Sequence, residues 1–346
     1  MPLPVLLIFA LVAQGPGSAS PPAGPADDEC LTCHAEPVDI TIAGQQRSVR
    51  VDVEALRKSV HAAKASCADC HPDAREIPHP ERPWSSPRQF TLAASEQCRQ
   101  CHFTDYRRTL DSVHAEAVKR GDQTAPVCVD CHGGHDIQSP NVPRTRVAAT
   151  CAKCHAGIAR IYANSVHGRD VAQNIADVPT CTDCHRTHDI AGPTQAGWRS
   201  TTPQICGRCH SDQTRMKKYG LSTNVLTTYV ADFHGKTASF RKATRNASPE
   251  TFVAVCSDCH GTHDVVRADA AASPVLKANL AHTCEKCHQG SGAQFPASWL
   301  SHYEPSFSHA PAVYAVKLAY WFLIPFVIGG LVLQILLHLW RVAVNR

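Results

Sequence analysis

The chain has 346 residues, a length that normally allows a sizeable apolar core. Its 34 Lys and Arg barely outnumber its 30 Asp and Glu, and the basic residues are scattered rather than clustered, which excludes a nucleic-acid partner. Only 6% of the residues are aromatic, whereas 18 are Cys and 21 are His, so sulfur and imidazole are the distinctive chemical groups.

The first 26 residues have the pattern of a secretory signal peptide. An apolar stretch from Leu3 to Ala13 is too short to span a bilayer and is followed by small residues, although no Lys or Arg precedes it. Cys30 begins a repeated motif, which argues against a lipid-modified Cys. We therefore predict a signal peptide over residues 1–26 and an exported domain over residues 27–310.

Nine C-x-x-C-H motifs follow, and together they contain every Cys of the chain. This spacing is the attachment signature of c-type haem, in which both thiols form thioethers and the His becomes an axial ligand of the iron. A zinc ribbon needs no His after its second Cys, and a disulfide framework gives no reason for the fixed spacing. We predict nine covalently bound haem c groups. The attachment residues are Cys30, Cys33, Cys67, Cys70, Cys98, Cys101, Cys128, Cys131, Cys151, Cys154, Cys181, Cys184, Cys206, Cys209, Cys256, Cys259, Cys284 and Cys287. The proximal iron ligands are His34, His71, His102, His132, His155, His185, His210, His260 and His288.

Nine porphyrins in so short a chain must supply much of its buried apolar surface. We expect a mainly α fold with long loops and no large sheet, wrapped around a nine-haem array, plus one C-terminal transmembrane helix. Haem binding then contributes directly to folding, as structural metals do. Counting 18 ionised propionates and nine ferric irons, the net charge becomes about −5 in the oxidised protein.

The motifs belong to a longer repeat. Four of them carry Asp before the second Cys, and three of these four continue as H-x-x-H-D. Another His recurs upstream, in S-V-H or D-F-H, within segments whose apolar spacing predicts a helix. The unit is therefore a two-haem module. The modules cover about residues 30–79, 98–136, 151–189 and 206–264, with a half module at 284–302.

The recurrent histidines supply nine candidates for the second, distal iron ligand. One class lies at the S-V-H position or its equivalent and contains His61, His114, His167, His234 and His302. The other class follows the second motif of a module and contains His79, His135, His188 and His263. Nine candidates for nine haems predict bis-histidine, six-coordinate iron throughout, the alternative for any one of them being an exposed or second-shell His. The spacing leaves open which His serves which haem, because ligands could cross between modules.

Several residues stay outside this scheme. His282 has no counterpart in the repeat, and His309 could replace His302 as a ligand. His338 could face lipid headgroups, ligate a haem b shared with a partner, or contact a quinone. The repeated Asp136, Asp189 and Asp264 are either second-shell acceptors for imidazoles or solvated turn carboxylates.

The C-terminal segment differs from the rest of the chain. Residues 318–340 carry no formal charge and are long enough to span a bilayer, and aromatic residues lie near both ends. Arg341 and Arg346 follow this stretch, against one Lys317 before it, which favours a cytoplasmic tail. We predict that residues 313–346 form a single-pass anchor in lipid of the cytoplasmic membrane, with the haem domain on the periplasmic side.

Parts of the sequence resemble a known family. The segments SVHAEAVKRGDQTAPVCVDCHGGHDI, TTYVADFHG and IPHPERP resemble exported multihaem c-type cytochromes with doubled CXXCH or cytochrome c3-like signatures, over about residues 30–310. More distantly, the histidine arrangement is similar to that of hydroxylamine oxidoreductase and tetrathionate reductase-type proteins. The resemblance implies a membrane cytochrome b or quinone-handling subunit as a partner, in an anaerobic respiratory chain.

Six-coordinate iron exchanges electrons with little rearrangement but cannot bind a substrate without losing a ligand. We therefore predict an electron carrier rather than an enzyme. It would relay electrons between a membrane quinol-oxidising partner near Cys284–His288 and soluble or outer-membrane redox proteins near Cys30–His34. The alternative is a multihaem reductase of a small nitrogen or sulfur compound at one open haem, although no motif here has a replaced proximal ligand. A polymeric extracellular wire would not need a membrane helix.

Overall fold

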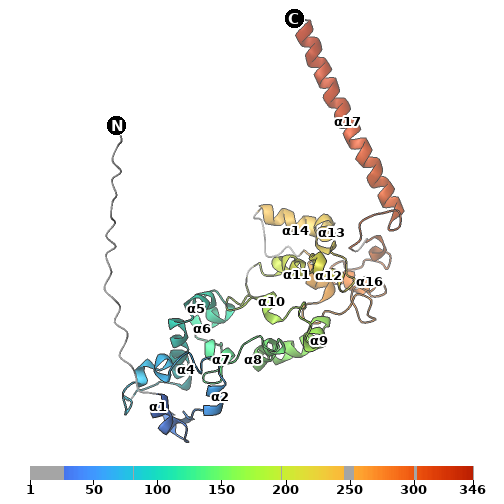
Figure 1. Ribbon diagram of the computed structural model, residues 1–346. Coiled ribbons are helices and arrows are strands. Elements are labelled where there is room, and N and C mark those ends of the chain that lie inside the picture. Colours follow the sequence, from blue (N-terminus) through green and yellow to red (C-terminus); the bar gives the residue numbers. More distant parts are fainter. Residues whose placement is uncertain (1–26, 81, 196, 245–252, 300–301, 346) are drawn as a thin grey trace, which may run out of the picture. The chain divides into compact units, whose positions relative to one another are not determined.

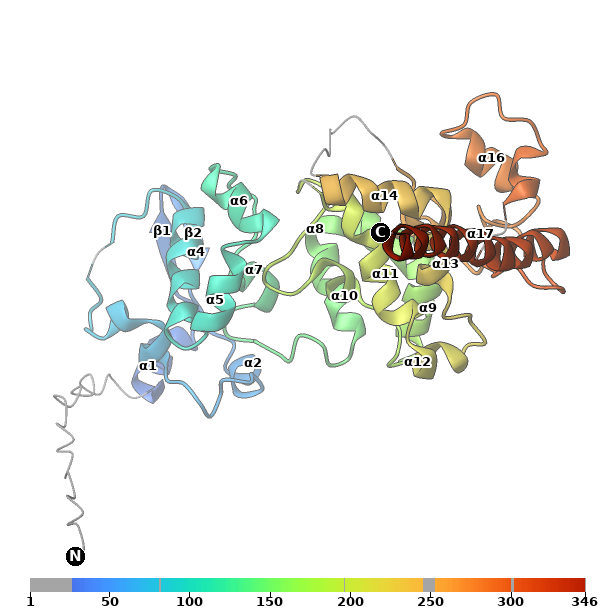
Figure 2. The same ribbon diagram turned by 90° about the horizontal axis from the view of Figure 1, so that it is seen from above.

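The computed structural model describes residues 27–80, 82–195, 197–244, 253–299 and 302–345 (Figure 1). The predicted signal peptide, residues 1–26, lies outside this part of the chain. The described residues are mainly helical, as predicted, and most of the helices are short and joined by loops (Figures 1 and 2).

The chain divides into two compact units. The described residues up to Thr104, together with Val127–Ser139, form unit 1. The segment Asp105–Pro126, together with the chain from Pro140 onwards, forms unit 2. The chain therefore enters unit 2, returns to unit 1 for one motif, and enters unit 2 again.

Unit 1 contains short helices and a small hairpin. Its elements are α1 (Asp27–His34), β1 (Asp39–Ile42), β2 (Gln45–Ser48), α2 (Val53–Arg57), α3 (Cys67–Cys70), the 3-10 helices η1 (Pro72–Ala74) and η2 (Gln97–Gln100), α4 (Pro87–Glu96) and α7 (Cys128–His132). Helix α5 (Phe103–Thr109) runs across the boundary into unit 2.

The hairpin of unit 1 packs on a helix. Strands β1 and β2 pair antiparallel, with Ile42 opposite Gln45, through a two-residue turn in which both Ala43 and Gly44 have positive φ angles. Such a turn matches the right-handed twist of paired strands. Ile42 is almost fully buried, and the guanidinium of Arg47 on β2 lies 5.1 Å from the centre of the Phe90 ring on α4.

Unit 2 contains the rest of the helices. They are α6 (Val113–Lys119), α8 (Thr145–Asn164), α9 (Val166–Ala172), α10 (Cys181–His185), η3 (Arg199–Thr201), α11 (Thr202–His210), α12 (Gln213–Lys217), α13 (Val225–Ala231), α14 (Phe233–Thr244), α15 (Cys256–His260), α16 (Leu280–Glu285), η4 (Phe295–Ser298) and α17 (Pro311–Val344). His114 and His167 lie on α6 and α9, which confirms the predicted helices.

The protein core is small. Among the described residues, the buried apolar side chains are Ile42, Ala68, Ala125, Val171, Val178, Ala191, Met216, Tyr229 and Val255. Most of these side chains are Ala or Val, which bury little area each. Such a core offsets only a small part of the conformational entropy lost on folding. The described side chains thus bury little apolar surface of their own, and it stays a prediction that haem supplies the rest.

Helix α17 is the longest element among the described residues. It has 34 residues, which corresponds to a rise of about 51 Å, and a bilayer core needs only about 30 Å. Its apolar side chains, among them Phe322 and Phe326, are exposed along the helix. The helix is thus long enough and apolar enough to span a membrane (Figure 1).

Candidate haem sites

Four motifs with Asp before the second Cys form a helical turn with the same internal bond. In each turn, the Asp side chain reaches back to the backbone N–H of the residue before the first Cys. The N–H of Val127, for example, donates to Oδ2 of Asp130 at 2.8 Å. This is one half of a capping box, which satisfies an N–H that the helix itself leaves unpaired. In these four motifs the Asp therefore stabilises the turn that presents two thiols and the imidazole. The acceptors are Asp69, Asp130, Asp183 and Asp258.

Three of these aspartates also bind an arginine that the sequence did not reveal. Nη1 of Arg88 lies 2.9 Å from Oδ2 of Asp130. Arg144 pairs with Asp183 and Arg199 pairs with Asp258 in the same way. Each arginine precedes the first motif of its own module, so it belongs to the repeat. The ion pair connects the two motifs of a module, because it links the segment before the first motif to the turn of the second.

The residue after three of the proximal histidines has a backbone conformation that favours glycine. Gly133, Arg186 and Gly261 have φ angles of 83°, 69° and 80°. A Cβ at Gly261 would lie 2.3 Å from Oδ1 of Asp264, so a carboxylate packs directly over this turn. The same oxygen accepts the N–H of Thr262 at 3.1 Å. For Asp264, the structure therefore favours the turn carboxylate over the second-shell acceptor.

Asp189 and Asp105 show a different arrangement. Asp189 binds the guanidinium groups of Arg108 and Arg186. The carboxylate next to His188 is that of Asp105 and not that of Asp189: Oδ1 of Asp105 lies 3.0 Å from Nδ1 of His188. Sequence reasoning missed Asp105, because it lies far from His188 in the chain and outside the repeated H-x-x-H-D pattern.

Three of the four upstream S-V-H and D-F-H segments begin helices, whereas Ser59-Val60-His61 lies in turns after α2, so the helix expected there is not found. Ser112 and Ser165 accept backbone N–H groups from Ala115 and Gly168, and Asp232 accepts the N–H of Gly235, all at 3.0 Å. Ser and Asp are both strong N-cap residues, which explains why they interchange at this position of the repeat. The cap fixes the first turn of the helix, and the recurrent His lies in this turn.

One backbone hydrogen bond recurs between successive modules. The N–H of Val60 donates to the carbonyl of Ile137 at 2.9 Å. The N–H of Val113 donates to Ile190, and that of Val166 to Val265, at 2.9 and 2.8 Å. In each case the valine of S-V-H binds the residue that follows H-D in the next module. This bond aligns the distal histidines of two neighbouring modules.

The structure brings proximal and distal candidates close together in pairs, with ring planes from 16° to 60° apart. Within the described part of each unit, eight proximal rings have a distal candidate with ring centres 5.9 to 6.4 Å away. The pairs are His34 with His79, His102 with His61, His71 with His135, His155 with His114, His210 with His167, His185 with His263, His288 with His234, and His260 with His302. The remaining proximal and distal candidates are His132 in unit 1 and His188 in unit 2.

These separations suit a haem iron between the rings. A metal–imidazole bond is about 2 Å and a ring atom lies about 1.1 Å from the ring centre, so two axial imidazoles should have centres about 6 Å apart. Direct ring stacking would bring flat rings closer than this, and unrelated histidines would show no common distance. The donor set therefore fits bis-histidine haem c, with thiols from the same motif close by.

Hydrogen bonds orient several of these rings. Nδ1 of His34 donates to the carbonyl of Val49 at 3.0 Å, and Nδ1 of His79 to that of Glu76 at 2.8 Å. The hydroxyl of Thr228 donates to Asn224 and can accept Nδ1–H of His302 at 3.2 Å. A proton held on Nδ1 leaves Nε2 as the ligating atom. Nδ1 of His185 is bonded in the same manner, to the carbonyl of Ala191 at 2.8 Å.

Burial keeps other rings neutral. It lowers the pKa of His167 to about 4, and the neighbouring His210 adds to this effect. Burial is also the main cause that lowers the pKa of His71, His210 and His260. Neutral imidazole is the form that binds metal, so these environments favour ligation.

The pairs follow a rule that the sequence left open: the facing histidines come from different modules. The first motif of a module faces the S-V-H histidine of the preceding module, as His155 faces His114. The second motif faces a histidine from the next module, as His185 faces His263.

His302 and His79 differ from the classes assigned to them. The sequence groups His302 with the S-V-H histidines, but it faces His260, the second motif of the module at 206–264. His79 faces His34, the first motif of the chain, which has no preceding module to supply a ligand. His309 was an alternative to His302, and its ring instead stacks on Tyr303 with centres 5.0 Å apart.

Within each unit, motifs that follow one another in the chain also lie side by side. The sulfur of Cys98 lies within hydrogen-bond reach of Cys128, and Cys151 and Cys206 lie equally close to Cys181 and Cys256. These pairs join the first cysteines of both motifs in one module.

The next contact joins one module to the following one. Cys184 is partly buried and lies close to Cys206 of the next module. Cys259 is likewise partly buried and lies close to Cys284. Inside each unit, the order of the attachment sites in space therefore follows their order in the sequence.

Comparison with known proteins gives one family. Residues 122–211 match the family model of cytochrome c3, and this segment contains four of the nine motifs, from Cys128 to His210. No curated protein and no solved structure matches the chain. The match supports a multihaem c-type cytochrome with covalently bound haem c, whose function is electron transfer.

Proposed function

We propose that this chain is a nine-haem, bis-histidine electron carrier. The observation that carries the proposal is the common separation of 5.9 to 6.4 Å between eight proximal and eight distal imidazoles in the described residues. Haem iron held by two histidines supplies one-electron redox chemistry with both axial positions filled. The residues of the chain keep those positions filled through helix caps, carbonyl acceptors and the bonds between modules.

The order of the motifs supports a relay along the chain. Neighbouring thiols connect successive motifs inside each unit, so the attachment sites form a series rather than an isolated centre. We propose that one end of this series exchanges electrons with soluble or outer-membrane redox proteins. The other end, at Cys284–His288, would exchange them with a cytochrome b or quinone-handling membrane partner.

Helix α17 supports a membrane-bound location. It follows the last motif in the chain and is apolar enough to span a bilayer. We propose that it anchors the protein in the cytoplasmic membrane, with the haem domain on the periplasmic side. The Arg residues beyond the apolar stretch support this orientation.

Electron paramagnetic resonance of the oxidised protein tests the proposal. We expect low-spin ferric signals only, because each iron has two imidazoles. His79→Ala should remove the distal ligand of the iron at His34 and produce a high-spin signal from about one iron per chain. His282→Ala is the matched control, because His282 lies outside the ligand scheme, and it should leave the spectrum unchanged. High-spin iron or rapid binding of nitrite or cyanide in the wild-type protein would instead favour a reductase.

A further inference from the structure

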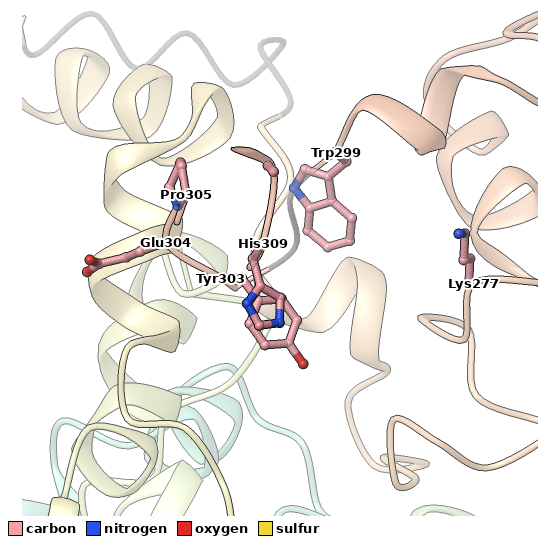
Figure 3. Close-up of a pocket in the computed structure, with 7 residues that line it drawn as sticks. Lys277, Trp299, Tyr303, Glu304, Pro305 and His309 are labelled. Atoms are coloured by element: carbon pink, nitrogen blue, oxygen red, sulfur yellow. The ribbon is translucent and has the colours of Figure 1, made fainter. Parts of the chain in front are cut away.

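A pocket lies immediately before the long apolar helix. It has a volume of about 390 Å³, which is within the range of small-molecule sites. Its lining residues are Lys277, Trp299, Tyr303, Glu304, Pro305, His309 and Ala310 (Figure 3). Ala310 is also the N-cap residue of α17, so the pocket and the helix are joined without a linker.

Two flat rings form one wall of the pocket. Tyr303 and His309 stack with ring centres 5.0 Å apart and planes only 8° apart (Figure 3). A tight turn holds His309 in place, because Ser306 donates its N–H to the carbonyl of His309 at 2.7 Å and accepts the N–H of His309 at 3.0 Å. Nδ1 of His309 lies 3.1 Å from the Ser308 hydroxyl, so Nε2 is the other polar atom of this ring.

Another wall of the pocket connects it to an iron ligand. The indole of Trp299 meets the ring of His302 edge-on, with centres 6.1 Å apart. His302 in turn faces the proximal His260 at 6.2 Å. A ligand in the pocket would therefore be separated from a distal imidazole by one aromatic side chain.

The surroundings of the pocket suit a membrane interface. Phe307 is 71% exposed and its ring packs edge-on against Tyr314 of α17, with centres 4.7 Å apart. Tyr303 is also mostly exposed. Exposed aromatic side chains at the end of an apolar helix are typical of the level of the lipid headgroups.

We propose that this pocket binds the headgroup of a membrane quinone. Such a headgroup is a flat ring with two oxygens, so it matches the stacked rings and the polar tips of Tyr303 and His309. The Lys277 ammonium can donate to a quinone oxygen. The inference rests on the proposed electron transfer, since a quinone is a useful ligand only beside a redox centre. It adds that this chain, and not only a partner, contacts the quinone.

The charges of the pocket argue against a phospholipid headgroup. Lys277 is the one cationic residue among the lining residues, and the acidic Glu304 is also present. The Glu304 carboxylate points away from the stacked rings (Figure 3). A phosphate would call for more cationic donors, whereas a neutral ring needs none.

Binding of 2-methyl-1,4-naphthoquinone tests the site. The haem-loaded full chain is placed in nanodiscs of zwitterionic lipid, and binding of the radiolabelled probe is compared with protein-free discs. We expect saturable binding to one site, weakened at least about tenfold by Tyr303→Leu and by His309→Leu. Lys277→Gln provides a milder pocket variant and should weaken binding less. Tyr219→Leu and His282→Leu are the controls, because both residues are exposed and lie outside the pocket. These variants should bind the probe with the affinity of the wild type.

Two results would overturn the site: no saturable binding by the wild type, or equal affinity in pocket variants and controls. Displacement of the probe by anionic lipid would assign the pocket to lipid and also overturn it. Spin-state spectra of the same samples separate this proposal from the proposed function. A low-spin spectrum without probe binding rejects the pocket alone, whereas high-spin iron in the wild type rejects the carrier. Variants that retain the wild-type haem content and low-spin spectrum are folded.

Discussion

Arg186 has a backbone conformation that glycine adopts at the two equivalent positions of the repeat. Its φ and ψ angles are 69° and 175°, a region that is nearly exclusive to glycine. This conformation costs about 1–3 kcal/mol for a residue with a Cβ. The exposed pair of Arg186 with Asp189 returns only about 0–1 kcal/mol. We therefore predict that Arg186→Gly raises the free energy of unfolding by about 1 kcal/mol, measured by denaturant titration of the haem-loaded protein.

The reverse change provides the control. Gly261→Ala introduces a Cβ into the same conformation, beneath the carboxylate of Asp264. This variant should lose stability. Equal stability of both variants and the wild type would mean that the turn is relaxed in solution.

Asp177 gives a pH-dependent contribution to stability. The hydrogen bond from Lys218, 2.7 Å long, lowers the pKa of Asp177 below its ordinary value. A lowered carboxyl pKa stabilises the fold above the unfolded-state pKa, and this contribution is lost as the pH falls through the folded-state pKa. Asp177→Asn should therefore lower Tm near pH 6, and this effect should shrink as the pH falls below about 4. A difference in Tm that grows toward acid pH would contradict this.

At the scale of single residues, the sequence revealed the haem-attachment residues but not the charged residues that bind to them or near them. The motif residues and the repeated Asp before the second Cys are visible because they recur at fixed spacing. Arg88 is not visible, because its partner Asp130 is 42 residues away and arginines are scattered along the chain. Asp105 near His188 could not be predicted for the same reason, because the two residues lie far apart in the chain.

The junction between α8 and α9 shows how the helices carrying distal histidines are held. Ser165 both donates to the carbonyl of Tyr162 and accepts the N–H of Gly168. Tyr162 donates its hydroxyl to the carbonyl of Pro179, just before the next motif. The same arrangement recurs at Tyr229, which donates to Ala254. The turn therefore holds a distal histidine and the following motif together.

Gly168 should be essential to this turn. A Cβ there would lie 2.0 Å from the carbonyl oxygen of Tyr162, which is backbone and cannot move aside. We predict that Gly168→Ala lowers the free energy of unfolding by about 3 kcal/mol, measured on haem-loaded protein. Gly157→Ala on α8 is the control, because a Cβ there meets nothing within 4 Å, and it should be neutral or slightly stabilising. A tolerated Gly168→Ala would show that α8 and α9 do not meet in this way.

The helices at the S-V-H positions could be predicted from sequence, whereas the pairing of their histidines could not. Apolar spacing and a capping Ser are local signals, and α6 and α9 follow them. The pairing depends on backbone bonds between distant residues, such as Val113 and Ile190. A bond between two backbone groups has no side-chain signature in either segment.

On the scale of the whole molecule, the haem domain and α17 differ in how they expose apolar side chains. The haem domain buries few apolar side chains of its own, while α17 exposes apolar side chains along its length. Composition alone predicted both properties, since low aromatic content and an uncharged stretch are visible in the sequence. The division into two units was not predicted, because it requires the chain to leave unit 1 and return to it.

Deletion of residues 313–346 should separate these two parts. Since the motifs and their facing histidines all precede residue 313, we expect the truncated protein to remain fully loaded with haem and to appear in the soluble fraction. Deletion of residues 342–346 removes only the tail, and this control should stay with the membranes. The measurement is haem staining of membrane and soluble fractions. Retention of the longer deletion in membranes would mean that α17 is not the anchor.

The proposed crossing of ligands between modules also has a consequence for biosynthesis. A growing chain presents His114 before His155, but it presents His185 before His263. The first motif of such a module can therefore acquire both of its imidazoles as soon as it emerges, whereas the second motif must wait for a later segment. A chain that stops after residue 288 would leave His260 without His302. The second motif of each module thus receives its distal histidine only after the next module has been synthesised. A prematurely terminated chain leaves the last such motif without a distal histidine.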